Sequence, residues 1–342
     1  MIDYLVSILT EFAIFAIMAI GLNIVWGWSG DFDLAYYGYV ALGAYMTLVL
    51  TIGPPTEPST YILGLTLPFP VAVLLAAASS MVLALIVGAI ALRHLRGIYF
   101  SIVTLGAVYV LYIFAGQFVP LFNGYNGLSG LFDPMGDVLG LDFTAYPYFY
   151  LALCVVVLAV VWVAVARLSS SRFGLALRSL REDERAAAVF GRDIYATKLK
   201  AYVLGAGIGG LGGGLFAGYL SAFNPSAWSP VETIILYAAI LIGGRGSTRG
   251  VVLGVAIMVM GLQEATRKLP EIAGNPAFAP ALRLIITGVV LVLFIRFRPQ
   301  GILPERRMHD KDPTGTGGAA VAALEEQVEH PVTAPAFGSG AT

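Results

Sequence analysis

The side chains best able to form specific polar contacts are gathered in one stretch, residues 177–200, which reads LRSLREDERAAAVFGRDIYATKLK. The segment 167–200 has eight basic and four acidic residues, although only 12% of the whole chain is charged. Both signs of charge surround a short apolar centre, which suits docking into a groove on a protein partner. The alternative is an interfacial helix whose basic side chains face lipid headgroups, but the acidic run EDE at 182–184 argues against an anionic membrane surface.

Residue types used in catalysis and metal binding are few and scattered. The three histidines, His94, His309 and His330, are far apart, and the one cysteine, Cys154, lies inside an apolar run. No metal-ligand spacing results, and no serine has the G-x-S-x-G context of a nucleophile. The chain also lacks G-x-x-x-x-G-K-[ST], so it does not hydrolyse ATP with a P-loop. We therefore predict a protein that is not an enzyme and holds no catalytic residue, metal or cofactor of its own.

Composition places the chain among membrane proteins. It is 58% hydrophobic with a mean hydropathy of +0.82, and stretches of about 20 apolar residues are long enough to cross a hydrocarbon core of ~30 Å. We predict an all-α, polytopic membrane helical bundle of about 8–10 spans with discontinuous helices and a cytoplasmic coupling helix. The predicted spans are 5–26, 33–53, 68–92, 97–118, 146–167, 198–222, 231–243, 250–265 and 280–297.

Charges between the spans predict the orientation. The 20 Lys and Arg residues begin only at Arg93, and eight of them fall between Arg167 and Lys200, so that segment is predicted to be cytoplasmic. The loop 119–145 has neither Lys nor Arg and is predicted to face outward. Nine spans then place the N-terminus outside and the C-terminus in the cytoplasm. Arg267 and Lys268 would lie outside, which is the one violation of the positive-inside rule.

Two apolar segments are interrupted. The run 231–243 is only ~20 Å of helix, too short to cross a bilayer, and GGRGSTRG separates it from the next run. Near the start, GLNIVWGWSGDFDLAYYGYVALGAY contains several glycines and two aspartates. Interruptions of this kind in both halves are typical of discontinuous helices along a translocation pathway. The alternative is two ordinary polar turns at the surface.

Residues 168–197 are predicted to form a helical elbow. A serine within 169–171 can cap a helix that begins near Phe173, and Gly191 can end that helix as its C′ glycine. A second short element, 193–200, then returns the chain to the membrane. The apolar side chains expected on one face of the elbow are Leu177, Leu180, Ala187 and Phe190.

Polar side chains within the spans are candidates for a pathway, because exposing them to lipid is costly. Asn23 and Thr104 are two of them, although such residues often only bond to a helix carbonyl. Tyr36 and Tyr37 can equally form an interfacial belt, packing or a pathway wall. The glycine-rich run 205–218 is interpreted as a surface for close helix packing.

Several of these stretches, taken in order, resemble a known family. The stretch 177–217 is similar to the cytoplasmic loop of ABC-importer permeases. Five further pieces resemble the LivM type of branched-chain amino acid permease, and together they cover most of residues 20–303. They are GLNIVWGWSGDFDLAYYGYVALGAY, LRGIYFSIVTLG, NGYNGLSGL, LIGGRGSTRGVVLG and FIRFRPQGIL.

The resemblance implies an ATP-driven importer in which this chain is the membrane-spanning permease. The implied partners are a second, LivH-like permease, two cytoplasmic ATPase subunits, an extracytoplasmic substrate-binding protein and membrane lipid. ATP and Mg would be bound by the ATPase subunits, and no nucleic acid is expected. The implied location is the bacterial cytoplasmic (inner) membrane, with several spans and a cytoplasmic C-terminus.

The resemblance also implies roles for particular residues. Gly191 would turn the coupling loop where a Cβ would clash, and Glu184 would meet a basic residue of the ATPase. The implied ATPase-coupling residues are Arg181, Glu182, Asp183, Glu184, Ala186, Ala187 and Gly191. The candidate pathway residues are Asn23, Asp33, Tyr36, Tyr37 and Thr104. The candidates for binding-protein docking are Asn123 and Asn126.

One departure from the family leaves the substrate open. The chain reads DFDLAYYGY where the family usually has a Ser-Leu-Gly-His-like run. Asp33, Tyr36 and Tyr37 therefore replace small or imidazole groups. The substrate implied by the resemblance is a branched-chain or related amino acid or, alternatively, urea or a short amide. An ion-coupled secondary transporter is a further alternative, weakened because no carboxylate lies in the middle of a span.

Two regions of different composition set the domain organisation. Residues 1–304 are predicted to be the transmembrane permease domain, with the coupling loop at 168–197. Residues 305–342 are rich in Gly, Ala, Pro and Thr and lack the apolar residues needed to offset chain entropy. We therefore predict a disordered cytoplasmic tail.

Overall fold

The computed structural model describes residues 2–55, 59, 61–95, 97–131, 134–136, 140, 142, 144–189, 191, 193–225, 230–263, 278–298 and 300–305. By its internal contacts the chain divides into two compact units, Met1–Pro304 and Glu305–Thr342. Of the second unit only Glu305 is described, so the disordered tail stays a prediction. The predictions for Phe190, Arg267 and Lys268 also lie outside the described residues.

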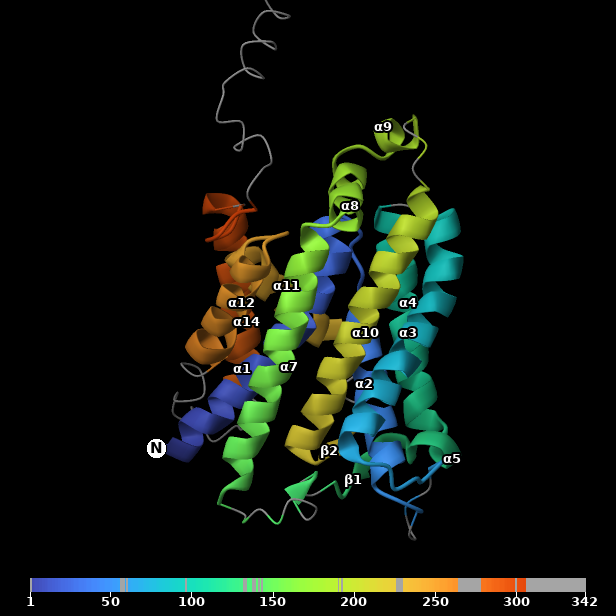
Figure 1. Cartoon of the computed structure of the whole chain (residues 1–342), viewed down its shortest axis with the longest axis vertical. Helices are drawn as coiled ribbons and strands as arrows, with labels where there is room; N and C mark the ends of the chain where they lie inside the picture. Colours follow the sequence, from blue (N-terminus) through green and yellow to red (C-terminus); the bar gives the residue numbers. More distant parts are fainter. Residues whose placement is uncertain are drawn as a thin grey trace, which may run out of the picture. The chain divides into compact units, whose positions relative to one another are not determined.

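The first unit is a helical bundle (Figure 1), which confirms the predicted all-α membrane fold. Each of the nine predicted apolar segments contains a helix. In chain order these helices are α1 (Ile2–Leu22) continued by η1 (Asn23–Trp28), α2 (Tyr36–Thr51), α3 (Phe69–His94), α4 (Ile98–Gln117), α7 (Tyr146–Ser169), α10 (Ile194–Leu220), α11 (Pro230–Gly243), α12 (Thr248–Val255) continued by η4 (Ala256–Gln263), and α14 (Phe278–Phe297).

The helices differ in their ability to cross a membrane. Within the described residues, α1 with η1, α3, α4, α7 and α10 are each long and apolar enough to do so alone. The pair α11 and α12–η4 bends by 119° at the break between its helices, as a broken span or a re-entrant loop does. The short, interrupted element predicted at 231–243 is therefore confirmed.

Close packing around α10 depends on its glycines. α10 packs against α1, α2 and α3. A Cβ at Gly205 would lie 2.8 Å from the Gly21 carbonyl oxygen, and one at Gly213 would collide with the Val40 carbonyl. Small residues let helix backbones approach closely inside a membrane, so the predicted packing role of 205–218 is confirmed.

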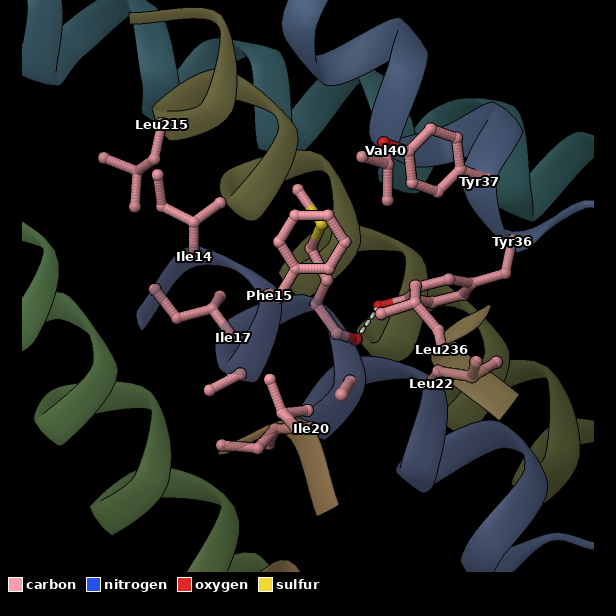
Figure 2. Close-up of a cluster of buried hydrophobic side chains, with 14 of the residues drawn as sticks. Ile14, Phe15, Ile17, Ile20, Leu22, Tyr36, Tyr37, Val40, Leu215 and Leu236 are labelled. Atoms are coloured by element: carbon pink, nitrogen blue, oxygen red, sulfur yellow. Dashed lines mark hydrogen bonds between the residues drawn. The ribbon is translucent and has the colours of Figure 1, made fainter. Parts of the chain in front are cut away.

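Buried side chains of α1 and α2 form the core beside α10. Figure 2 shows Ile14, Ile17 and Tyr36 within this cluster. Tyr36 is fully buried, and its hydroxyl donates to the carbonyl oxygen of Met18 at 2.6 Å and approaches that of Gly205 at 3.3 Å. This contact joins α2 to α1 and α10 through a polar group that is satisfied inside the chain.

The first span does not run directly into the second. α1 ends in the π-helix η1, and the irregular linker 29–35 precedes α2. π-helical turns are rare and frequently mark functional sites. Ser29 and Asp33 in the linker are buried, at 3% and 0% exposed. The turn 244–247 between α11 and α12 is likewise largely covered. Both interruptions therefore fit discontinuous helices better than ordinary surface turns.

Short elements lie at opposite ends of the bundle (Figure 1). One end, which we call the α8 end, carries α8 (Arg172–Glu182) and α9 (Glu184–Val189). The other, the ladder end, carries α5 (Val119–Phe122), η2 (Gly124–Asn126), β1 (Leu128–Ser129) and β2 (Ala222–Phe223). β1 and β2 pair antiparallel, with Leu128 opposite Phe223. Strands of two residues have too little sequence pattern to be predicted.

Candidate functional site

α8 is the buried half of the predicted elbow. Ser171 is its N-cap, as the serines at 169–171 predicted, and accepts a bond from the Gly174 N–H at 3.5 Å. Leu177 and Leu180 are buried, and the helix contacts η1, α7 and α10. α8 ends at Glu182 because the next residue has an extended backbone.

α9 is a separate helix, so the prediction of one helix ending near Gly191 is wrong. Asp183 has φ −152° and ψ 107°, and its Oδ1 accepts bonds from the N–H groups of Arg185 at 2.8 Å and Ala186 at 3.1 Å. Aspartate side chains compete for backbone N–H groups in this way, which breaks one helix and caps the next.

Most of α9 is exposed to solvent. Ala187 is buried, whereas Val189 is 86% exposed. We call the exposed surface the α9 tip; it comprises Glu182, Asp183, Arg185, Ala186, Ala188 and Val189. Its small apolar side chains beside both signs of charge have the character of a surface that docks into a partner's groove.

Gly191 follows α9 with φ +72°, a conformation that favours glycine. Outside the neighbouring residues, no described atom lies within 4 Å of an added Cβ, so the strain predicted for a side chain there comes from the local backbone. The backbone angle, not crowding, calls for glycine. The second short element predicted at 193–200 is also not separate: Asp193 caps α10 by accepting a bond from the Ala196 N–H at 2.9 Å, so these residues begin α10.

Lys198 in α10 bridges two carboxylates. Its Nζ lies 2.7 Å from Asp31 Oδ1 and 2.5 Å from Glu184 Oε1, and the Lys198 and Asp31 side chains are each only 11% exposed. Burial raises the pKa of Asp31, and the Lys198 ammonium opposes that shift. Glu184 thus ties α9 to α10 within this chain, while its contact with an ATPase stays a prediction.

Two arginines of α8 point inward to η1. Arg181 Nη1 donates to the Gly27 carbonyl oxygen. Arg178 donates to Ser169 through Nη1 to the carbonyl oxygen at 3.2 Å and through Nη2 to Oγ at 2.5 Å, and its guanidinium lies 5.7 Å from the centre of the Trp28 ring. The first coupling residue predicted from the sequence, Arg181, is therefore engaged inside the chain.

The turn 244–247 holds η1 from another side. Trp28 Nε1 donates to the Gly246 carbonyl oxygen at 3.1 Å, and Asn23 Oδ1 accepts a bond from the Gly246 N–H at 3.0 Å. Arg245 Nε donates to the Trp26 carbonyl oxygen at 3.2 Å, and its guanidinium lies 4.8 Å from the centre of the Trp26 ring, within cation–π range.

The five predicted pathway residues are all buried: Asn23, Asp33, Tyr36, Tyr37 and Thr104. Most of them fasten the linker and the start of α2 to neighbouring helices. Thr104 Oγ1 accepts a bond from the Leu34 N–H at 3.2 Å, and the Tyr37 N–H donates to Thr233 Oγ1 at 3.2 Å. Asp33 Oδ1 accepts a local bond from the Ala35 N–H at 2.9 Å, and the Asp33 N–H donates to the Tyr237 hydroxyl of α11 at 2.8 Å.

The five residues are tied into the described helices mainly through contacts within the chain. Neither of the two cavities described for the chain is lined by any of the five. A role along a substrate pathway therefore stays a prediction, and their contacts inside the chain are the finding.

At the ladder end the two predicted docking residues differ in placement. Asn123 is buried with φ +60°, and its Nδ2 donates to the Gly127 carbonyl oxygen at 2.7 Å, so it shapes the loop. Asn126 is exposed and borders a cavity of about 380 Å³. The other lining residues are Leu128, Ser129, Leu220, Ala222, Phe223 and Asn224.

Sequence reasoning missed the inward-facing contacts of Arg178, Lys198, Arg245 and Trp28. The available signal was the position of these residues in or beside the two interruptions and the charged loop. Among the described residues, no group of three or more His, Cys, Asp and Glu could hold a metal ion. The described contacts of the site hold helices together by ion pairing and hydrogen bonding.

Comparison with known proteins adds independent findings. The sequence profile of a family described as branched-chain amino acid transport system / permease component matches residues 4–295. The high-affinity branched-chain amino acid transport system permease protein LivM of Escherichia coli is 31% identical over 324 residues, covering 88% of this chain and 70% of the relative. The probable LivM of Methanocaldococcus jannaschii is 27% identical, covering 89% of this chain and 94% of the relative. The nucleoside ABC transporter permease protein NupC of Lactococcus lactis is 29% identical, covering 43% and 45%. No solved structure matches.

Proposed function

The chain belongs to the family of branched-chain amino acid transport system permease components, and we propose that it carries branched-chain or closely related amino acids into the cell. As a member of that family it is a multi-pass inner-membrane permease of the ABC type. Movement of the substrate is driven by ATP that separate subunits hydrolyse.

The observation that carries this proposal is the α9 tip in a chain of this family. The tip is exposed, partly apolar and charged at its rim, and it stands at the end of the bundle where α7 and α10 meet the loop (Figure 1). An ATPase subunit binds there, and a second, LivH-like permease provides a second tip for a second ATPase.

The orientation follows from the positive charges. The α8 end faces the cytoplasm and the ladder end faces outward. A substrate-binding protein lands on the ladder end, over the cavity that Asn126 borders. The C-terminus is cytoplasmic.

The proposed substrate rests on the relatives. LivM of E. coli and LivM of M. jannaschii carry branched-chain amino acid transport in their names, and each aligns over nearly nine-tenths of this chain. The match to a nucleoside permease covers less than half of it. We therefore expect leucine, isoleucine or valine to compete for uptake, and nucleosides and urea not to compete.

The test is transport in proteoliposomes. The permease is purified with the proteins that co-purify from its own cells, reconstituted, and supplied with ATP inside and the binding protein with labelled leucine outside. We expect uptake that requires ATP and withstands an ionophore. Uptake without ATP that an ionophore abolishes would contradict the proposal, as would uptake of labelled urea in place of leucine.

A further inference from the structure

The segment 26–31, which we call the junction segment, contains the end of η1 and the first residues of the linker. It is touched from the α8 end by Arg181 and Lys198 and from another side by Arg245. We propose that movement of the coupling loop reaches the membrane-spanning helices through this segment. The inference rests on the proposed function, because it names the path by which the ATPase acts on the permease.

The junction segment offers backbone carbonyls for such contacts because it contains the end of a helix. The last carbonyls of a helix have no intrahelical donor and need other partners. Here the Gly27 carbonyl oxygen accepts from Arg181, and the Trp26 carbonyl oxygen, which also accepts from the Gly30 N–H at 3.2 Å, accepts from Arg245 at 3.2 Å. Both arginine donors are guanidinium groups, whose charge strengthens the bond and whose several N–H groups fix its direction.

The two arginines converge on one residue. Gly30 has φ +88°, and a Cβ there would lie 3.1 Å from Arg181 Cγ and 3.7 Å from Arg245 Nη2. The linker backbone therefore passes between a residue of the coupling loop and a residue of the turn that joins α11 to α12. If α8 moves, either the turn 244–247 moves with it or a contact that Arg181 or Arg245 makes with the junction segment breaks.

Lys198 adds a second connection that begins at α9. Its ammonium joins Glu184, at the start of α9, to Asp31 in the junction segment. Ser29 Oγ in turn donates to the other oxygen of Asp31. A pull or a tilt of α9 is thereby applied to Asp31 through a largely buried ion pair, which water and salt screen far less than an exposed pair.

On the far side the junction segment is bound to the bent pair α11 and α12. Trp28 donates to Gly246, and a Cβ at Gly27 would lie 2.9 Å from the Gly246 nitrogen, so the two backbones nearly touch. The Trp26 ring packs edge-on to Tyr237 of α11 with their centroids 4.9 Å apart. The path therefore runs from the α9 tip through the junction segment to the one bent helix pair described in the chain.

Two substitutions test the path in the reconstituted complex, each with a matched control. Arg181→Gln is compared with Arg172→Gln, an exposed arginine of the same helix. Lys198→Gln is compared with Lys200→Gln, an exposed lysine two residues further along α10. Three quantities are measured: co-purification of the ATPase, ATP hydrolysis, and substrate moved per ATP hydrolysed.

We expect both test variants to keep the ATPase and its hydrolysis but to move at least about fivefold less substrate per ATP, the lower end of typical coupling between sites. The two controls should stay within about twofold of wild type, the range left by the loss of one exposed charge. Unchanged transport per ATP in both test variants overturns the inference. Loss of the ATPase from both variants also overturns it, because the residues would then serve docking alone. If neither variant folds, Asp31→Asn decides, because it breaks the same connection while leaving Lys198 paired with Glu184.

A spectroscopic readout separates transmission from mere stabilisation. In a Cys154→Ala background, Phe32→Cys places a spin label beside the junction segment, at a position that is 38% exposed. ATP should change the label's mobility in the wild-type complex and in Arg172→Gln, but not in Arg181→Gln. A response that Arg181→Gln leaves intact contradicts the inference. Lack of any ATP-driven uptake by the wild-type complex would instead count against the proposed function itself.

Discussion

The two ends of the bundle join their loops by different means. At the ladder end, the loops after α4 and α10 are joined by backbone pairing between β1 and β2, and Asn123 closes a local turn with a neutral bond to Gly127. At the α8 end, cationic side chains reach across to carbonyls and carboxylates of another segment, as Arg181 and Lys198 do.

This difference suits different tasks. A backbone ladder fixes two strands in one register, because a shift by one residue changes every pair. Charge-assisted side-chain bonds set no backbone register between the two segments, yet they are strong and directional enough to make one segment follow the other. On the path proposed above, we expect movement to be transmitted at the α8 end while the ladder end keeps its register.

The largest expected effect is that of an arginine at Gly191, two residues beyond the α9 tip. Gly191→Arg should lower ATP-driven uptake by more than about tenfold, since a charge forced into a docking groove costs at least ~1.4 kcal/mol of binding. The fold should remain, because the site is exposed and no described atom lies near the added Cβ. Uptake and ATPase co-purification measure the effect.

Gly140 at the ladder end offers the matched control. It has φ +61°, is exposed, and has no described atom within 4 Å of an added Cβ, so Gly140→Arg imposes similar backbone strain. We expect it to transport normally. Equal damage from both substitutions would show that strain, not docking, explains the effect, and wild-type uptake by Gly191→Arg would exclude the α9 tip as a docking surface.

The second effect concerns stability at the α8 end. Lys198→Met leaves Asp31 and Glu184 facing the site without their shared cation, and removal of one partner from a buried ion pair costs about 3–5 kcal/mol. Because Glu184 is partly exposed, the lower value is expected. Unfolding in denaturing detergent should occur earlier for Lys198→Met than for Asp31→Asn, which leaves Lys198 a second carboxylate. The reverse order would contradict the bridging role of Lys198.

The third effect is smaller and lies at the ladder end. Asn123→Ala removes a neutral hydrogen bond, worth about 1 kcal/mol, and places alanine at φ +60°, which costs a further ~1 kcal/mol. Asn123→Gly removes the bond without the strain and should be less destabilised. The melting temperature of the purified chain measures both, and a loss larger than that of Lys198→Met would reverse the comparison between the two ends.

The smallest effect is expected from Asn126→Ala. The side chain is exposed and borders the ladder-end cavity, so stability should not change. The binding-protein concentration that half-maximally stimulates ATP hydrolysis should rise about threefold. This rise corresponds to the loss of one contact worth under 1 kcal/mol. An unchanged titration would remove Asn126 from the docking surface.

Much of the fold could be predicted because apolar length is a local property. Each of the nine apolar segments contains a helix, and the short run at 231–243 became the bent pair. Ser171 was identifiable as a cap from its residue type and place. The break at Asp183 was not, because the same apolar face continues across it to Ala187 and hides the boundary.

The sequence by itself determined the class of the protein, its apolar segments, its two interruptions and the loop in which its charges gather. All of these follow from residue types that are close together in the chain. Only the tertiary structure decided what the charges touch. Lys198 and Asp31 are separated by 167 positions, and Arg181 and Gly27 by 154. Helix packing around α10 brings them together, and no local pattern encodes that contact.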